Sequence, residues 1–402
     1  MSKAPSAAPW LTLVGLGENG PDGLSPASRQ AIDSAEIVMG PPRHLSFLPD
    51  IAAEPVAWPV PFVDGLAMLK RFRGRRVVVL ASGDPFWFGA GAAIARTLDA
   101  PDWHALPGPS TFSLAASRLG WSLERTLCLG LHAAPLARLR PHLAPGVRAI
   151  VLLRDGPAVA ELAAFLDAAG FGDSALTVME ALGGPREKLT PCKPASVPQG
   201  AAHPVAVAIA VSGDGAAMPR ASGIPDAFFE TDGQLTKRPI RALALSALAP
   251  KPFETLWDIG GGSGSIAVEW LLAHPTTEAV SVERRPDRAA MIRANADRLG
   301  VDRLQVVEGA APDALDGLTP PQAVFIGGGL SDALLEDLTA RLPSGTRLVA
   351  HAVTLGSEAR LSDWSERYGG TLLRIDLSEA APLGPRRGWK AAWPVVQWQV
   401  VL

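Results

Sequence analysis

The chain has 402 residues, of which 48% are hydrophobic and 19% are charged, and its formal net charge is −3. This length predicts two or three domains, and the small negative charge gives no support for nucleic-acid binding. The N-terminal stretch MSKAPSAAPWLTLVGLG lacks a basic segment followed by a long apolar one, so it does not resemble a secretory signal. No run approaches the roughly 20 apolar residues of a membrane span. We therefore expect a cytoplasmic protein with no membrane partner.

The two cysteines, Cys128 and Cys192, lie far apart in the sequence. Neither belongs to a C-x-x-C motif or a histidine-rich cluster. The sequence therefore implies neither a disulfide framework nor a zinc site, and we expect no bound metal.

In the first half of the chain, apolar strand-like segments run repeatedly into turns, which is typical of α/β domains. These stretches are WLTLVGLGENG (10–20), RRVVVLASGDPFWFGAG (75–91), HALPGPSTFSLAASRLGW (104–121) and RAIVLLRDGPAVAELAAFL (148–166).

Residues 212–233 are rich in Gly, Pro, Ala and acidic residues without a sustained period, which predicts a linker. Residues 235–250 have helical periodicity despite Pro239. Strand-like and helix-like segments then alternate, which predicts a parallel doubly wound sheet. The expected strands are 254–259, 278–283, 304–308, 321–327 and 345–353. The final runs TLLRIDLSE and WPVVQWQVVL have no clear helix between them and predict a closing antiparallel hairpin.

The stretch WDIGGGSGSIAVEW (257–270) combines a short apolar strand, a glycine-rich turn and a helix. Gly260, Gly262 and Gly264 permit positive φ and let a ligand approach the backbone closely. The following helix, which Ser263 or Ser265 could cap, adds free N–H groups and a positive dipole end. The pattern predicts a site for a small polar ligand, while a tight turn without a ligand is the alternative.

Two ligands compete for this loop, a nicotinamide dinucleotide and S-adenosylmethionine (SAM). The G-x-G-x-G spacing departs from the dinucleotide fingerprint, because Ser265 stands where its third glycine or alanine is expected. A carboxylate at Asp258 gives a pyrophosphate no advantage, but it suits the ammonium and sulfonium groups of SAM. Glu283 ends the next strand about 20 residues on, where an acid can accept from a ribose diol; a solvated strand-end carboxylate is the alternative. The stretch resembles motif I of the class I SAM-dependent methyltransferases.

The N-terminal motifs, in their order and spacing, resemble the tetrapyrrole methylases, which have two α/β lobes with SAM between them. One departure is Glu18-Asn19, where that family often has Pro-Gly. GLGENG, SGDPFWFG, PGPSTFSLA, GIPDAFFETDGQLTKRPIRAL and WDIGGGSGSIAVEW together resemble the bifunctional, decarboxylating methyltransferases of aerobic cobalamin biosynthesis. The resemblance implies an α/β chain: a two-lobed tetrapyrrole methylase domain at 1–211, a linker at 212–233 and a Rossmann-like class I methyltransferase domain at 234–402. It also implies two SAM sites per chain, a precorrin substrate and a homo-oligomer.

Under this resemblance, the first domain methylates ring carbon C-5, and the second methylates C-15 and removes CO2 from an acetate side chain. The SAM contacts expected in the first domain are Ser82, Gly83, Asp84, Trp87, Ser110 and Thr111. Core packing is the alternative for Trp87, and helix capping is the alternative for Ser110 and Thr111. The contacts expected in the second domain are Thr236, Asp258, Gly260, Gly262, Gly264, Glu283 and Ala311. Thr236 is expected to open the helix that covers the cofactor, where an ordinary N-cap is its alternative.

A substrate with many carboxylates calls for basic residues. Lys237, Arg238 and Arg241 on the covering helix are candidates, and His351 could act as an acid or base. For each, a solvated or structural position is the alternative. No residue identifies the decarboxylation machinery. The rival functions are a methyltransferase fusion acting on another tetrapyrrole carbon, a nicotinamide oxidoreductase, and a carrier of an intermediate with one degenerate SAM site.

Overall fold

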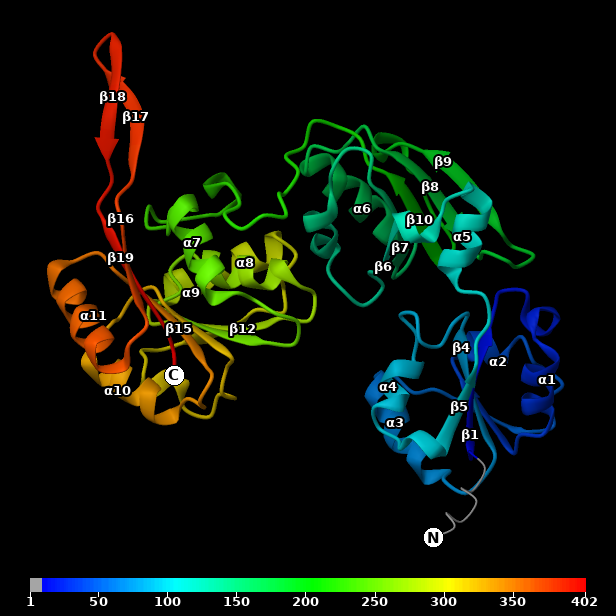
Figure 1. Ribbon diagram of the computed structural model, residues 1–402. Helices are drawn as coiled ribbons and strands as arrows, with labels where there is room; N and C mark the ends of the chain where they lie inside the picture. Colours follow the sequence, from blue (N-terminus) through cyan, green and yellow to red (C-terminus); the bar gives the residue numbers. More distant parts are fainter. Residues whose placement is uncertain (1–8) are drawn as a thin grey trace. The chain divides into compact units, whose positions relative to one another are not determined.

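The computed structural model describes residues 9–402, so the first eight residues of the N-terminal stretch lie outside the described part. The described residues divide into two compact units (Figure 1). The first contains the described residues up to Ala134 together with Ala144–Ala216. The second contains Pro135–Leu143 and Ala217–Leu402. None of the described helices combines the length and hydropathy needed to cross a bilayer.

The first lobe of the first unit is a parallel sheet with the strand order β3-β2-β4-β1-β5. Apolar side chains pack on both faces, Leu11 and Leu13 on one and Val14 and Leu16 on the other, as expected for strands without polar alternation. The strands are β1 (Leu11–Leu16), β2 (Ile37–Gly40), β3 (Glu54–Ala57), β4 (Val77–Ser82) and β5 (Trp103–Leu106). The helices are α1 (Pro26–Asp33), α2 (Pro42–Leu45), α3 (Phe62–Arg71) and α4 (Gly91–Ala95).

The second lobe has a mixed sheet with the order β6-β7-β10-β8-β9, in which β6 and β7 are parallel and the other pairs are antiparallel. Its strands are β6 (Thr126–Gly130), β7 (Arg148–Leu153), β8 (Ala175–Glu180), β9 (Lys188–Cys192) and β10 (Val205–Ala210), and its helices are α5 (Thr111–Leu119) and α6 (Pro157–Ala168). The apolar face of α5 packs on this sheet through Phe112, Ala115 and Ala116. The helix α5 therefore leads the chain from the loop after β5 onto the second lobe.

The second unit is a doubly wound sheet with the order β13-β12-β11-β14-β15-β19-β16. The pairs from β13 to β15 are parallel, and β19 runs antiparallel to both β15 and β16. The strands are β11 (Thr255–Ile259), β12 (Glu278–Glu283), β13 (Gln305–Glu308), β14 (Ala323–Ile326), β15 (Arg347–Ala352), β16 (Thr371–Ile375) and β19 (Val395–Val401). The helices are α7 (Arg238–Leu248), α8 (Ser265–Ala273), α9 (Pro286–Arg298), α10 (Asp332–Arg341) and α11 (Leu355–Tyr368). The predicted alternation and the terminal antiparallel pair are confirmed.

Between β16 and β19 the chain forms a two-stranded arm that the sequence did not predict. The arm consists of β17 (Ser378–Leu383) and β18 (Arg386–Ala391), which pair only with each other among the described strands and project from the sheet (Figure 1). Its turn has a positive φ of 60° at Gly384, as a two-residue hairpin loop requires. Leu383 and Trp389 of the arm are exposed. The arm therefore lacks the alternation of buried and exposed residues from which strands are predicted.

The segment after residue 216 packs onto the second unit, although its composition predicts a linker. Ile224 and Phe229 are buried in the core that also contains Trp270 of α8. The backbone N–H groups of Gly223 and Ile224 donate to the Glu269 carboxylate, at 2.6 and 3.0 Å. The composition did not reveal this burial, because two isolated apolar side chains and two main-chain N–H groups make the contacts, without a sustained periodic pattern. Short 3-10 turns complete the structure: Gly20–Gly23, Ala100–Asp102, Leu123–Arg125, Leu136–His142, Pro194–Ser196, Asp226–Phe228 and Asp313–Leu315.

Candidate cofactor sites

Three loops meet at the carboxyl ends of β1, β4 and β5 in the first unit. The Gly83 N–H donates to the Leu16 carbonyl at 3.1 Å, and the Gly108 N–H donates to the Gly83 carbonyl at 3.0 Å. A Cβ atom at Gly15 would collide with the Gly83 carbonyl oxygen and the Gly108 nitrogen. Glycine at Gly15 is therefore required for the close approach of the three backbones.

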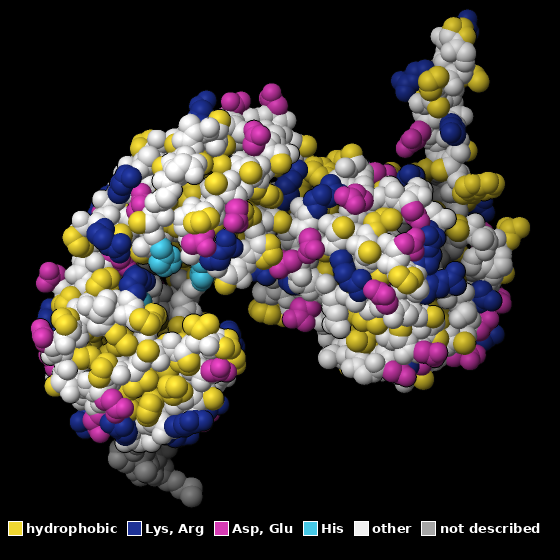
Figure 2. Space-filling model, turned by 180° about the vertical axis from the view of Figure 1, so that it is seen from behind, with side chains coloured by type: hydrophobic (Ala, Val, Ile, Leu, Met, Phe, Trp, Pro, Cys, Tyr) yellow, Lys and Arg dark blue, Asp and Glu magenta, His cyan; other side chains and the backbone are white. Residues whose placement is uncertain are grey.

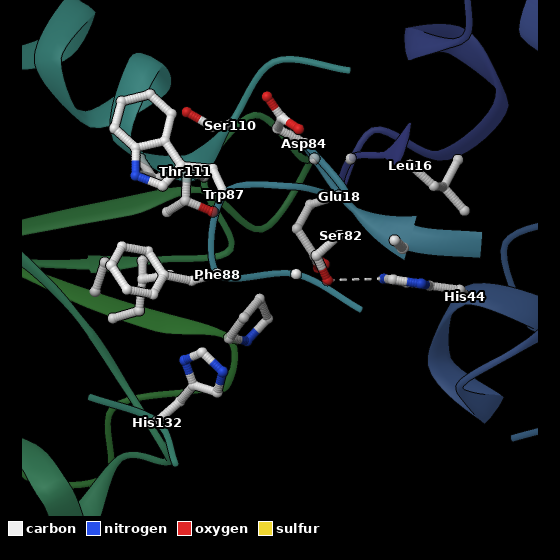
Figure 3. Close-up of a pocket in the computed structure, with 18 of the residues that line it drawn as sticks. Leu16, Glu18, His44, Ser82, Asp84, Trp87, Phe88, Ser110, Thr111 and His132 are labelled. Carbon is white, nitrogen blue, oxygen red and sulfur yellow. Dashed lines mark hydrogen bonds between the residues drawn. The ribbon is translucent and has the colours of Figure 1, made fainter. Parts of the chain in front are cut away.

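A cavity of about 440 Å³ opens beside these loops, within the size range of small-molecule sites. Trp87, Phe88 and Thr111 lie on one side of it, and Ser82 and His44 lie on the other (Figure 3). The residues that the sequence predicted as cofactor contacts all line this cavity: Ser82, Gly83, Asp84, Trp87, Ser110 and Thr111. Their convergence is as predicted, and contact with SAM itself stays a prediction.

The structure also fixes the local role of several of these side chains. Ser110 is buried and is the N-cap of α5, where its Oγ accepts from the Ser113 N–H at 3.1 Å. Asp84 Oδ1 accepts from the Phe86 N–H at 2.9 Å, which closes the turn after Gly83. Trp87 is 36% exposed and contacts Phe112 with ring centroids 5.1 Å apart, so its ring forms a wall of the cavity rather than part of the core.

A polar network beside Ser82 was missed in the sequence. Arg43 donates through Nη2 to His44 Nε2 at 3.0 Å and to Ser82 Oγ at 3.2 Å, and it forms an ion pair with Glu18. Burial, followed by the charge of Arg43, lowers the pKa of His44 to about 4. His44 is therefore neutral near pH 7 and can accept at Nε2. The only sign of this network in the sequence was the histidine itself, and a single histidine in a short helix most often has a structural role.

In the second unit, the glycine turn after β11 has the strained backbone that the sequence predicted. The φ angles of Gly260, Gly262 and Gly264 are 71°, 60° and 75°. A Cβ at Gly260 would lie 2.7 Å from the Gly328 backbone, whereas a Cβ at Gly262 would meet nothing closer than 4.0 Å. Gly262 therefore faces open space, while Gly260 lets the loops after β11 and β14 touch. The glycines of that second loop, residues 327–329, were not singled out in the sequence.

The helix that follows is not capped by the side chain of its N-cap residue. The helix α8 begins at Ser265 with Gly264 as its N-cap and no side-chain cap, so the expected capping by Ser263 or Ser265 is wrong. Both serines are buried instead. The Ala267 N–H of the first turn hydrogen-bonds the buried Asp258 carboxylate, so an acid from β11 holds this end of α8.

Two buried acids lie under the glycine loop. Glu283 is 4% exposed, and its carboxylate accepts from the Gly262 N–H and the Arg285 N–H, both at 3.0 Å. The alternative interpretation of Glu283, as a solvated strand-end carboxylate, is therefore wrong. Asp258 is 1% exposed and accepts from Ser281 Oγ at 3.5 Å. Burial raises the pKa of Asp258 from 3.8 to about 7, the Ala267 N–H and the Ser281 hydroxyl oppose this shift, and the nearby Glu283 adds to it.

Thr236 and Ala311 are both partly exposed and lie outside regular elements. The helix α7 begins at Arg238 with Lys237 as its N-cap, so Thr236 precedes the helix rather than opening it. Ala311 lies in the loop after β13, close to the end of the strand that neighbours β12. The structure thus places Ala311 near the same sheet edge as Glu283, and cofactor contact by either residue stays a prediction.

Arg241 is not a substrate-binding residue, which corrects the sequence interpretation. Its side chain is fully buried and donates to the Glu269 carboxylate and to the carbonyls of Thr236 and Ile224, each at 2.5 Å. It also pairs with Asp226 at 3.0 Å. These contacts hold the segment before α7 against α8, and the fully buried guanidinium is closed to a bound molecule.

The other basic candidates have different surroundings. Lys237 is exposed, and Arg238, also exposed, donates through Nε to the Gly223 carbonyl at 2.6 Å. His351 lies within β15 rather than after it, where Nε2 is 3.0 Å from Gln397 Oε1 and the ring meets Phe325 edge-on. Burial lowers the pKa of His351, so its imidazole is neutral near pH 7.

Two family models match the chain in the same order as its two halves. Tetrapyrrole (corrin/porphyrin) methylases match residues 10–198, and the precorrin methyltransferase domain matches residues 227–402. By class, the chain is therefore a methyltransferase, which implies SAM as the methyl donor.

The curated relatives give a narrower assignment. The chain is 50% identical to a precorrin-6Y C(5,15)-methyltransferase [decarboxylating] of Sinorhizobium sp, with 97% of this chain and 96% of that protein covered. It is 39% identical to the protein of the same name from Mycobacterium tuberculosis, with 97% and 99% covered. A crystal structure of the C-terminal domain of the Rhodobacter capsulatus precorrin-6Y C5,15-methyltransferase is 51% identical, with 46% of this chain and all of that chain covered and a TM-score of 0.45. The chain belongs to the family of decarboxylating precorrin-6Y C(5,15)-methyltransferases.

Proposed function

We propose that each unit binds its own SAM, and that the chain transfers methyl groups to C-5 and C-15 of a precorrin-6 intermediate of cobalamin biosynthesis and removes CO2 from its acetate side chain to give precorrin-8. The observation that carries this proposal is the presence of a separate glycine-lined site in each unit. The first unit has a cavity at three strand ends, and the second has a glycine turn followed by the N-terminus of α8. Ligands of parallel α/β sheets bind at such carboxyl ends.

We assign the C-5 transfer to the first unit and the C-15 transfer with decarboxylation to the second. In each transfer, a nucleophilic ring carbon attacks the sulfonium methyl group, a C–C bond forms, and the S–CH3 bond breaks with its electrons going to sulfur. Neutrality returns when the methylated carbon loses its proton, or when the acetate C–CO2 bond breaks and its electron pair enters the ring system. The protein supplies alignment and exclusion of water, and orientation alone can contribute about 7–11 kcal/mol at best.

The residues of each unit have distinct tasks in this scheme. Trp87 and Phe88 present apolar surface to the cavity of the first unit, which favours a flat, largely apolar ring and keeps water from the methyl group. In the second unit, Glu283 can accept from the ribose hydroxyls of SAM, and the Gly262 region gives the cofactor close access to the backbone. The expected homo-oligomer and cytoplasmic location rest on the family resemblance, and sedimentation and cell fractionation test them.

The decisive experiment is Asp84→Ala in the full chain, with the reaction product analysed by mass spectrometry and NMR. We expect a product that lacks the methyl group at C-5 and still has lost CO2, because Asp84 belongs to the first unit alone. Glu336→Ala, which changes an exposed acid on α10 that belongs to neither candidate cofactor site, serves as the control. Loss of both transfers in a folded Asp84 variant would contradict the division of labour. Calorimetry with SAM should give two sites per chain, and one site would contradict the proposal.

A further inference from the structure

A buried carboxylate connects the two lobes of the first unit at the cavity. Glu18 follows β1, and its side chain is only 9% exposed. The carboxylate pairs with Arg43 of α2 and with Arg186 in the loop between β8 and β9, where Arg186 Nη2 lies 3.2 Å from Oε2. Arg43 belongs to the first lobe and Arg186 to the second. Glu18 therefore fixes one guanidinium from each lobe at the same place.

The loop that carries Arg186 is itself held in place. A Cβ at Gly184 would lie 2.6 Å from Glu18 Cβ, so the loop packs directly on Glu18. Glu187 accepts two hydrogen bonds from Arg118 of α5, at 2.6 and 3.0 Å, and one from the Gly183 N–H at 2.6 Å. Arg186 is thus presented by a braced loop rather than by a free one.

Within this cluster one carboxylate faces two guanidinium groups, so its charges do not cancel. Glu18 and Arg43 line the cavity, as does Asp84, and Arg186 adjoins the cavity through Glu18. Burial lowers the pKa of the Arg43 guanidinium, and the charge of Arg186 lowers it further. The same two arginines, after burial, lower the pKa of His203 on the cavity wall. Arg154 differs, since Asp155 and Glu161 neutralise it at 2.8 and 3.1 Å. Figure 2 shows histidine and basic side chains gathered around the hollow of this unit. A partly buried excess of positive charge is stabilised when an anion joins it.

We propose that Glu18 is a positioning residue that holds Arg43 and Arg186 as a receptor for one carboxylate of a molecule bound in the cavity. Two sources offer this group, a carboxylate side chain of the tetrapyrrole and the amino-acid end of the cofactor. The inference rests on the proposed function of the cavity and deepens it, because it names the side chains that recognise a carboxylate of the bound molecule. Guanidinium groups suit this task, since their planar donors match a carboxylate.

The test uses Arg186→Gln in the full chain, with Arg71→Gln as the matched control. Arg186 is 57% exposed on its side chain, so the variant should fold, and Arg71 is an exposed arginine at the end of α3 in the same unit. Two probes are titrated: S-adenosylhomocysteine by calorimetry, and uroporphyrin, a stable tetrapyrrole with carboxylate side chains, by fluorescence. We expect Arg186→Gln to weaken one probe about tenfold or more at one site, and Arg71→Gln to weaken neither.

The probe that weakens identifies the source of the carboxylate. A loss confined to uroporphyrin, with a raised KM for the precorrin and little change in kcat, assigns the receptor to the substrate. A loss confined to S-adenosylhomocysteine assigns it to the cofactor. Arg186→Lys should restore part of the affinity, because lysine supplies the positive charge without the planar paired donors of a guanidinium group. Glu18→Gln keeps both cations but removes their positioning group, so it should weaken the same probe.

The receptor is overturned if neither affinity changes in Arg186→Gln and Glu18→Gln while the melting temperature of the first unit falls, since the cluster would then be structural. Failure of the proposed function has a different signature. In that case Asp84→Ala leaves the methylation pattern unchanged, but the uroporphyrin titration still shows whether Arg186 and Glu18 bind a carboxylate.

Discussion

The two candidate sites share glycine-lined strand ends but have opposite electrostatic character. In the first unit, the cluster beside the cavity pairs one carboxylate, that of Glu18, with the two guanidinium groups of Arg43 and Arg186. In the second, Asp258 and Glu283 are buried under the loop, and their hydrogen-bond donors are backbone N–H groups and one hydroxyl, which carry no full charge. The first site therefore favours an added anion and the second an added cation. SAM carries both a carboxylate and a sulfonium, so one cofactor can satisfy either environment through a different end.

The largest expected effect comes from adding a methyl group where the loops touch. Gly15→Ala forces a Cβ into the backbone of Gly83 and Gly108, which cannot move aside as a side chain would. We expect the first unit to lose about 4–5 kcal/mol or more, together with C-5 methylation. Gly260→Ala, at φ 71° and 2.7 Å from Gly328, should remove C-15 methylation and decarboxylation instead. Product mass and differential scanning calorimetry measure both.

Gly74→Ala is the control for this pair, because its positive φ is combined with open space around the added Cβ. It should cost about 1 kcal/mol and spare both transfers. If Gly15→Ala retained full C-5 methylation, the three-loop junction would not support the first site.

The next effect concerns Arg241, whose contacts join the segment before α7 to α8 in the second unit. Arg241→Met leaves the buried Glu269 carboxylate without its cation, which we expect to destabilise the second unit by about 3–5 kcal/mol. The first unit should keep its melting temperature. Thermal unfolding of the full chain, followed calorimetrically, tests this. Arg360→Met breaks an exposed pair with Asp332 and should cost at most about 1 kcal/mol. Equal effects of the two variants would contradict the assignment.

Sequence patterns predicted the sheets and the glycine turns because both depend on local chemistry. The strand β11 and the turn at Gly260 follow from an apolar run and from the need for positive φ. The arm of β17 and β18 escaped prediction because its side chains are exposed on both faces and leave no alternation. Similarly, Arg241 resembled a ligand-binding arginine in the sequence, since nothing local shows that Glu269 and Thr236 surround it.

The cluster of Glu18, Arg43 and Arg186 shows the same limit at the first site. The three residues are distant in sequence, and Arg186 belongs to the other lobe, so only the folded chain brings them together. Glu18 was noted as a departure from the usual Pro-Gly, and that departure is the one local signal that could have led to the cluster. The cofactor loops, in contrast, each lie within a single continuous motif.

A smaller effect separates the two roles of Glu283, as a ribose acceptor and as a support of the loop. Both of its oxygens already accept hydrogen bonds from backbone N–H groups. In Glu283→Gln, the side-chain NH2 group therefore faces one of these N–H groups, and both are donors. We expect SAM affinity at the second site to fall by about 1.5–3 kcal/mol, and stability to fall by about 1–3 kcal/mol. Calorimetric titration and chemical unfolding measure the two quantities separately.

Glu308→Gln is the matched control, because Glu308 is the register partner of Glu283 on β13 but is exposed and pairs with Arg293 at 2.7 Å. This variant should change neither quantity by more than about 0.5 kcal/mol. If Glu283→Gln lowered stability alone and left SAM affinity intact, Glu283 would be a structural residue.

The smallest effect is a pH dependence that only the second site should show. The pKa of Asp258 is raised to about 7 in the folded chain, against 3.8 for the unperturbed group, so between these values the folded state binds a proton that the unfolded state has lost. Stability from this group is therefore present at low pH and declines as the pH rises through 7. Between pH 6 and 8 the decline amounts to about 1.4 kcal/mol. Asparagine at position 258 cannot titrate. The difference between the unfolding free energies of the parent and of Asp258→Asn should therefore change by that amount over this range, because the contributions of the other groups cancel.

The parent protein should also release protons when it binds SAM at pH 7, because the positive charge of SAM favours the ionised Asp258 carboxylate. The variant should release fewer protons. Calorimetry in buffers of different ionisation enthalpy counts these protons. Identical pH profiles and proton counts in both proteins would show that Asp258 is ionised throughout, and the second site would then lack the uncompensated acid that distinguishes it from the first.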